Sequence, residues 1–474
     1  MIKYKHLLFK IKQMKTALLL LSLFLSVEGF SQYQVGHRTI TFNDPSRSGG
    51  FGSGGGAGRQ IQSEVYYPAA TAGNDVAISS GQFPYIVFGH GFVMAWDSYQ
   101  NFIDHYVPLG YVLVFPRTEG SLSPVHQDFS LDLSLVGTKM AAFSMDASSF
   151  FFQAWNGRKA VMGHSMGGGS SFLAAAQNTA NFDVLVGLAP AETNPSAIDV
   201  SSNISIPTLI FSGTEDAVTA PATNHKPMYD SIVNTCKHFI SIIGGGHCYF
   251  ANSSTTCDFG ESTSGGNITI TRAVQHDITF DALDPYLKFY LMKDCPSWPV
   301  FTTQRDTDTR IQSLSVCTYS LPVNPLITQN GSVLSIPSTS LTISWFLNGT
   351  ELIGESSQTI NTQQYGNGTS EVHVSDLSGC YGSASQEVVT NGTNGLDEPV
   401  EWMFSVYPNP TKGVVTIQTN TSDSKPFELT DIEGRKILQF EVQLKSEVSL
   451  EELESGTYFL RSTHSSQLRR LIRK

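Results

Sequence analysis

The feature that most constrains the fold of this chain is a series of short, continuously apolar runs, each ending in Gly, Pro or a polar residue. Strands that are apolar on both faces suit a parallel sheet covered by helices. The segments between the runs, such as 97–109 and 167–178, have the length and periodicity of helices. We therefore predict an α/β domain with a mostly parallel sheet over residues 33–317. The runs are residues 84–91, 111–117, 159–165, 182–190, 207–213 and 238–246.

The pattern changes downstream of this domain. Residues 318–392 alternate apolar and polar positions between Gly and Asn turns, which predicts a small β-sandwich. Residues 393–402 predict a linker, and residues 403–474 return to regular strand and turn alternation. The chain is therefore expected to hold one large α/β domain followed by two small all-β domains.

The first 32 residues have the features of a signal peptide. Five lysines within residues 1–15 precede the apolar run 16–27, and small or polar residues follow it. The run is shorter than the roughly 20 residues that a helix needs to cross a bilayer, so we expect export without a permanent membrane span. The net charge is -12 even with these lysines included. This net negative charge argues against a nucleic-acid partner, because phosphate binding needs clustered Lys and Arg.

Export to an oxidising compartment makes disulfides available to the cysteines. Their number is even and they show no CxxC spacing, so we predict disulfides and no metal site. The spacing does not choose among the pairings. We expect Cys317 to pair with Cys380 inside the middle domain and Cys248 with Cys257 across a short loop. The six residues are Cys236, Cys248, Cys257, Cys295, Cys317 and Cys380.

A candidate nucleophile lies where a predicted strand meets a predicted helix. Residues 163–167 read Gly-His-Ser-Met-Gly and match the pattern G-x-S-x-G. In that context the serine sits on a sharp turn and projects its hydroxyl from the edge of the sheet. Ser165 is therefore the predicted nucleophile.

A serine hydroxyl needs a base to take its proton, and the base needs an acid that orients it. The chain order for this kind of turn is serine, acid, histidine. Asp216 follows the apolar run that ends at 213 and is the predicted acid. Glu215 is the neighbouring competitor, and Asp199 and Asp230 are poorer choices because Asp230 falls within a predicted helix.

His247 is the predicted base. It follows three glycines that can carry the imidazole back over the sheet edge. His276 lies in a helical stretch and His238 starts a strand, so both are expected to have structural roles. His90 and His164 flank glycines and are expected to brace loops.

The negative charge that develops on the substrate oxygen needs two backbone N–H donors. One comes from the residue after the nucleophile, Met166, and the other from the loop after an early strand, where Phe92 is the candidate. The alternative for Phe92 is a plain core position.

These residues resemble the cutinase-like polyester hydrolases, including poly(ethylene terephthalate) hydrolases, in the dienelactone-hydrolase-like branch of the α/β-hydrolase superfamily. The resemblance covers about residues 36–300 and implies hydrolysis of carboxylic esters without a cofactor. It implies polyester substrates as well, because the site in that family is a shallow surface cleft. The motifs that carry it are GHGF (89–92), GHSMGGG (163–169), EDAVTAP (215–221), NHKPMYDSI (224–232) and GGGH (244–247).

The same resemblance implies substrate-binding positions. The family holds an aromatic residue at Phe92 and a tryptophan that together sandwich an aromatic acyl ring, but this chain has Ala191 where the tryptophan would sit. The missing wall argues against efficient turnover of aromatic polyesters. Met166 and Val218 would line the acyl pocket, and Trp96 is either a replacement wall or packs under its loop.

The C-terminal segment resembles the type IX secretion sorting domain of Gram-negative bacteria. It has YPNP at 407–410, a Gly-Thr-Tyr strand at 456–458 and a basic end. The resemblance implies the type IX secretion machinery as a partner and an extracellular or cell-surface destination. The alternative is a generic β-module with a basic tail. The middle domain resembles immunoglobulin-like modules.

Together these patterns predict a monomeric, secreted serine esterase that acts on polymeric or small esters through an acyl-enzyme and needs no cofactor. Two alternatives stay open. The same three residues would serve a small-ester esterase, a lipase or a peptidase. The chain could instead be an adhesive protein whose hydrolase segment is inert.

Overall fold

The computed structural model describes residues 33–376, 379–388, 404–419, 424–432, 434–462 and 468–474. The predicted signal peptide and the predicted linker at 393–402 lie outside these residues. By their contacts the residues divide into two units, one that reaches to Val388 and one that begins at Val389. Each unit is described by itself. No helix in the described part of the chain is both long and apolar enough to cross a membrane.

An 11-stranded sheet forms the frame of the first unit, with the strand order β11-β10-β9-β8-β7-β5-β6-β3-β1-β4 and β2 paired to β3. Six neighbouring strands of this sheet run parallel to one another. Each corresponds to one of the apolar runs, so the predicted α/β-hydrolase fold with a mostly parallel sheet is confirmed. The six are β5 (Phe83–Gly89), β6 (Val112–Pro116), β7 (Trp155–His164), β8 (Val184–Leu188), β9 (Thr208–Gly213) and β10 (Lys237–Ile242).

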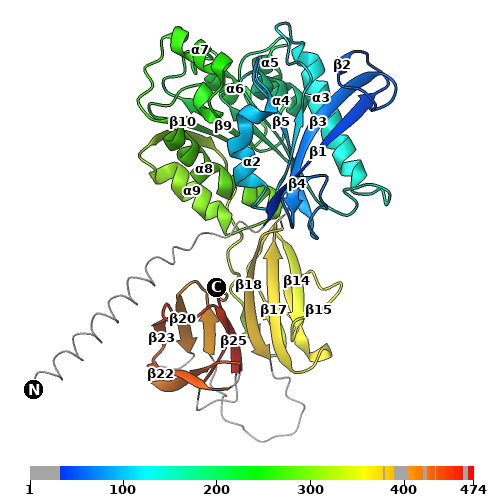
Figure 1. Cartoon of the computed structure of the whole chain (residues 1–474). Coiled ribbons are helices and arrows are strands. Elements are labelled where there is room, and N and C mark those ends of the chain that lie inside the picture. The colour runs from blue at the N-terminus through cyan, green and yellow to red at the C-terminus, as the bar shows by residue number, and fades with distance from the viewer. Residues whose placement is uncertain (1–32, 377–378, 389–403, 420–423, 433, 463–467) are drawn as a thin grey trace, which may run out of the picture. The chain divides into compact units, whose positions relative to one another are not determined.

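Both faces of the parallel strands are buried, which explains why the runs are continuously apolar. In β5, Ile86 and Phe88 point into one core and Tyr85 and Val87 into the other. The first core is closed by α2 (Gln100–Tyr106), α8 (Arg272–Met292) and α9 (Ser297–Thr307), and the second by α3 (His126–Phe143), α4 (Met166–Gln177), α5 (Ala197–Val200) and α6 (His225–Ser231) (Figure 1).

At each margin of the sheet, the strand next to the parallel group pairs antiparallel with it. At one margin β3 (Arg59–Ala69) pairs with β6 and with β1 (Gln34–Asp44), and the exposed glycine-rich residues 49–58 connect β1 to β3. The short strands β2 (Gly50–Phe51) and β4 (Gly73–Asn74) complete this margin. At the other margin β11 (Ile311–Val316) pairs with β10. β1 and β11 carry exposed or half-buried side chains at most positions, so they lack the apolar runs of the centre.

The two predicted all-β segments are confirmed as small antiparallel sheets. The middle segment has a three-stranded and a four-stranded sheet around the fully buried Trp345. Its strands are β12 (Thr328–Asn330), β13 (Val333–Ser335), β14 (Thr342–Leu347), β15 (Thr350–Glu351), β16 (Thr359–Asn361), β17 (Gly368–Ser375) and β18 (Tyr381–Val388).

The second unit also combines a three-stranded with a four-stranded sheet, and its core includes Ile417, Phe427 and Leu460. Its strands are β19 (Phe404–Tyr407), β20 (Val414–Thr419), β21 (Lys425–Thr430), β22 (Lys436–Val442), β23 (Lys445–Ser449), β24 (Gly456–Ser462) and β25 (Leu468–Arg473).

The disulfides confirm one predicted pair and correct the other. Cys248 pairs with Cys257 as expected. The predicted pair of Cys317 with Cys380 is wrong, because Cys317 pairs with Cys236 and Cys380 with Cys295. The reason is the margin strand β11, whose antiparallel register places Val316 opposite Lys237 and so brings Cys317 beside Cys236. The Cys295–Cys380 bond ties the middle segment to the α/β domain, and the Cys236–Cys317 bond joins the ends of β10 and β11 within that domain.

Candidate active site

Ser165 occupies the sharp turn between β7 and α4, with backbone angles φ 55° and ψ -123°. The turn requires glycine on both sides. A Cβ on Gly163 would lie 2.2 Å from the carbonyl oxygen of Gly167, and a Cβ on Gly167 would lie 2.1 Å from that of Gly89. The G-x-S-x-G pattern therefore reflects the close approach of strand and helix around a strained serine.

The structure brings together the three side chains that the sequence predicts as nucleophile, base and acid. The Ser165 hydroxyl lies 2.9 Å from Nε2 of His247, and Nδ1 of His247 lies 2.8 Å from Oδ2 of Asp216. Each side chain follows a different parallel strand, β7, β9 or β10, at the carboxyl edge of the sheet. Serine and histidine are 82 residues apart in sequence, yet the geometry is that of an activated nucleophile.

Backbone donors hold the Asp216 carboxylate in place. Its Oδ1 accepts the N–H groups of Val218 at 2.9 Å and Thr219 at 2.8 Å. Burial alone would raise the pKa of Asp216, but the charge and hydrogen bond of His247, with smaller contributions from His225 and Thr219, lower it well below its usual range. Asp216 is therefore ionised at neutral pH and can orient the imidazole.

Thr219 and His225 extend this network, and no sequence pattern singled them out. The Thr219 hydroxyl lies 3.1 Å from Oδ2 of Asp216, 2.9 Å from Nδ1 of His247 and 3.0 Å from Nε2 of His225. His225 is fully buried, and Nδ1 lies 2.9 Å from the Ser212 hydroxyl. Burial lowers the pKa of His225 to about 4, so this second imidazole is neutral behind the acid. Both residues lie within motifs that carry the resemblance, but only the fold shows that they meet.

The competing acids have other partners. Thr214 donates to the Glu215 carboxylate at 3.3 Å, and Asp230 binds Lys226 at 2.6 Å. Asp199 lies in the short helix α5, where its N–H is capped by Ser196. In the described residues Asp216 is thus the carboxylate that meets the His247 ring.

His164 braces the loop that carries His247. Its Nε2 donates to the backbone oxygen of His247 at 3.0 Å, since a carbonyl can only accept, and Nδ1 faces the Tyr99 hydroxyl at 3.0 Å. Burial holds the pKa of His164 well below its usual range. The other histidines considered as bases also bond elsewhere: His90 to the oxygens of Gly91 and Thr118, His238 to Ser315, and His276 to the oxygen of Ala251.

Phe92 and Met166 lie on adjacent loops, as an oxyanion hole requires. Phe92 follows β5 and Met166 follows β7, and these strands are paired with Gly89 opposite Gly163. Met166 is the first residue of α4, where a backbone N–H has no partner within the helix. The Phe92 side chain is 45% exposed, which excludes the alternative of a core position.

The predicted substrate-binding residues Ala191, Val218 and Trp96 have different surroundings in the structure. The Ala191 N–H donates to the backbone oxygen of Ser165 at 2.9 Å, and Val218 is 41% exposed beside Asp216. Trp96 packs instead under its loop, with Nε1 bonded to Tyr66 at 3.0 Å and the Arg117 guanidinium 4.3 Å above its ring. Of the two roles predicted for Trp96, these contacts favour packing over that of a replacement wall.

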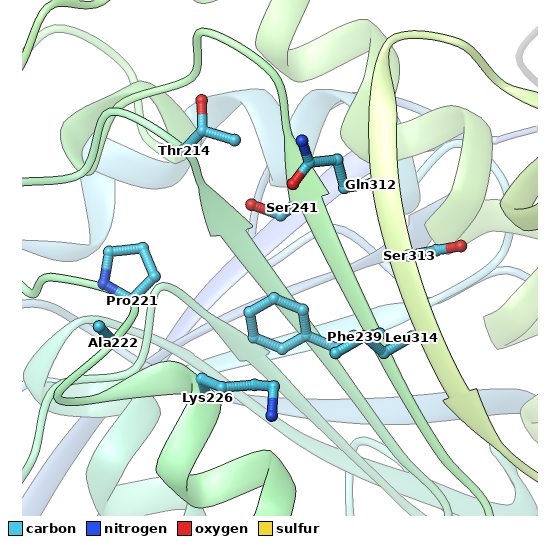
Figure 2. A pocket seen from close by; sticks show the side chains of 9 residues that line it. All are labelled: Thr214, Pro221, Ala222, Lys226, Phe239, Ser241, Gln312, Ser313 and Leu314. Atoms are coloured by element: carbon cyan, nitrogen blue, oxygen red, sulfur yellow. The ribbon is translucent and has the colours of Figure 1, made fainter.

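A cavity of about 430 Å³ lies between the loop that carries Asp216 and strands β10 and β11 (Figure 2). Pro221, Phe239 and Leu314 supply its apolar lining, and Lys226 lies at one end. None of Ser165, Asp216 and His247 lines it. Across the described residues no cluster of His, Cys, Asp or Glu is arranged to hold a metal ion.

Comparison with known proteins places this geometry in context. Residues 31–266 match the family described as PET hydrolase-like, and residues 405–474 match the secretion system C-terminal sorting domain. Cutinase est2 of Thermobifida alba is 28% identical over 228 residues, which cover 46% of this chain and 66% of that protein. Cutinase 1 of Thermobifida cellulosilytica is 34% identical over 91 residues, which cover 19% of this chain and 33% of that protein. The chain thus spans 66% or less of the length of each of these relatives.

Proposed function

Because residues 31–266 belong to the PET hydrolase-like family, we propose that this protein is an exported serine hydrolase that cleaves carboxylic esters, with polyesters as its substrate class. The observation that carries the proposal is the line of hydrogen bonds from Ser165 through His247 to Asp216, at 2.9 and 2.8 Å. A neutral imidazole in that position can take the serine proton as the hydroxyl attacks.

The proposed reaction has two halves. In the first, the Ser165 oxygen bonds to the ester carbonyl carbon while His247 accepts the hydroxyl proton. The Phe92 and Met166 N–H groups stabilise the oxyanion, and the C–O bond to the leaving alcohol breaks as His247 returns the proton to that alcohol. In the second, water loses a proton to His247 and attacks the acyl carbon, and the proton then passes to the Ser165 oxygen. Neither half needs a cofactor.

The surroundings of the serine support a polymeric substrate. Phe92, in the loop after β5, and Val218, in the loop that carries Asp216, both expose apolar side chains, and exposed apolar surface can bind a polymer segment that a deep pocket would exclude. The sorting domain at 405–474 supports export through type IX secretion to the extracellular side, where polymers are found.

Replacing Ser165 with Ala tests the proposal. The variant should lose hydrolysis of a p-nitrophenyl ester, because the base and the oxyanion donors would have no nucleophile to serve. The matched control Ser121→Ala changes an exposed serine and should retain the wild-type rate. A Ser165→Ala rate above about a tenth of wild type would reject the assignment.

The substrate class needs a second measurement. Products released from aliphatic and aromatic polyester films should include free acids and alcohols, and parallel peptide substrates should stay intact. Cleavage of peptides without cleavage of esters would favour the peptidase alternative, and inactivity on both panels would favour an adhesive role.

A further inference from the structure

The chain that follows His247 folds back onto it. Residues Cys248–Phe250 form a short 3-10 helix, η3, and Thr255–Ser264 form α7. The disulfide between Cys248 and Cys257 joins the two elements directly after the histidine. The predicted function assigns no role to this covalently closed loop.

One carboxylate of α7 faces the backbone of the histidine. Oε1 of Glu261 accepts the N–H of His247 and Oε2 accepts the N–H of Cys248, each at 2.6 Å. The residue is 7% exposed. A Cβ on Gly246 would lie 2.7 Å from Oε1, so the glycine before the histidine leaves the room that the carboxylate occupies. Glu261 thus holds two successive peptide groups at the base.

Within the described residues no Lys or Arg forms an ion pair with Glu261. The neighbouring Arg272 pairs instead with Asp258 at 2.6 Å. The pKa of Glu261 is raised, mainly by burial and also by the charge of Asp216. The two backbone N–H groups and the charge of His247 act in the opposite direction. A buried carboxylate without a cation is costly, and an imidazolium is the charge that would favour it.

From these contacts we infer that Glu261 is a positioning residue for His247, an inference that rests on the proposed function. Its oxygens fix the backbone from which the imidazole extends, and its negative charge favours the imidazolium that forms during the reaction. The Cys248–Cys257 disulfide anchors α7 so that Glu261 stays in place.

The variant Glu261→Gln tests this role. An amide has one acceptor atom, so its NH2 group would face a second N–H donor, and the charge is lost. The expected result is a fall in kcat on a p-nitrophenyl ester of about tenfold to a hundredfold with little change in KM, because the base is misplaced but the substrate contacts remain. The acid limb of the pH–rate profile should also move to lower pH, since the imidazolium loses a favourable charge.

Asp277→Asn is the matched control, because it removes the same charge from an exposed position on the neighbouring helix α8. It should leave kcat and the acid limb unchanged. The double variant Cys248→Ser with Cys257→Ser releases α7 without touching Glu261 and should move both quantities in the same direction as Glu261→Gln.

The outcomes separate the two proposals. If the wild-type protein hydrolyses no ester, the proposed function fails and the role of Glu261 fails with it. If the wild type is active and Glu261→Gln matches it, only the positioning role is overturned. A loss of kcat with an unmoved acid limb would mean a purely structural role and would also overturn it. If Glu261→Gln does not fold, an unmoved acid limb in the double cysteine variant would overturn it.

Discussion

Replacing Asp216 with Asn should leave the shape of the site intact but move the ring proton of His247 from Nδ1 to Nε2. In the protein, Oδ1 accepts the N–H groups of Val218 and Thr219 and Oδ2 faces Nδ1 of His247. The two backbone donors would select the amide oxygen, so the amide NH2 would turn toward Nδ1. Nδ1 must then accept, and Nε2 carries the ring proton toward Ser165. A nitrogen that already carries a proton cannot take one from the serine.

The size of the effect follows from that wrong tautomer together with the loss of a negative charge beside the imidazolium. For triads of this kind the change lowers kcat by about 10⁴-fold, which corresponds to about 5 kcal/mol of transition-state stabilisation. KM should change little, because Asp216 is 3% exposed and cannot contact the substrate.

The assay is steady-state hydrolysis of a p-nitrophenyl ester by the full chain, with the thermal transition measured to confirm folding. Glu215→Gln is the matched control because it alters the competing acid next in sequence, and it should keep at least about a third of the wild-type kcat. An Asp216→Asn kcat within about tenfold of wild type, or a larger loss in Glu215→Gln, would refute the reasoning.

Three further predictions concern stability and substrate. Burial lowers the pKa of His225 from 6.5 to about 4, so between these pH values the unfolded chain binds a proton that the folded chain does not. The free energy of unfolding, measured by urea titration, should therefore fall by about 3 kcal/mol from pH 7 to pH 4, and by less in His225→Phe. An equal fall in the wild type and the variant would contradict this. Replacing Cys295 and Cys380 with Ser opens a bond with a sequence separation of 85 and should cost about 4 kcal/mol in urea unfolding, so an unchanged midpoint would count against it. Ala191→Trp restores a second wall opposite Phe92 and should raise product release from aromatic relative to aliphatic polyester film, and an unchanged ratio would remove the missing-wall explanation.

The apolar runs predict the central sheet because both faces of β5 to β10 are buried, so each strand is visible in the sequence without its neighbours. β11 has no such signal, because its side chains are largely exposed, and its antiparallel pairing with β10 is decided by the tertiary fold. The error at Cys317 follows from that one strand, since its partner Cys236 lies 81 residues away.

The same distinction applies to the site. The sequence predicts Ser165 from a pattern whose glycines are required by local sterics, and it predicts Asp216 and His247 from their order after strand ends. Thr219 acts through the carboxylate of Asp216, and Glu261 acts through backbone N–H groups. A side chain that binds the backbone of another residue leaves no pattern in the sequence. Its role can be recognised only in the folded chain.

Covalent labelling is the measurement that most directly tests whether the side chains following β7, β9 and β10 form one catalytic site. A fluorophosphonate reacts with a serine whose proton is accepted by a neighbouring base, so peptide mapping of the labelled wild-type protein should find the adduct on Ser165 alone. His247→Ala should label far more slowly although its serine is intact. An adduct on another serine, or equal labelling of the folded His247→Ala variant, would contradict the account.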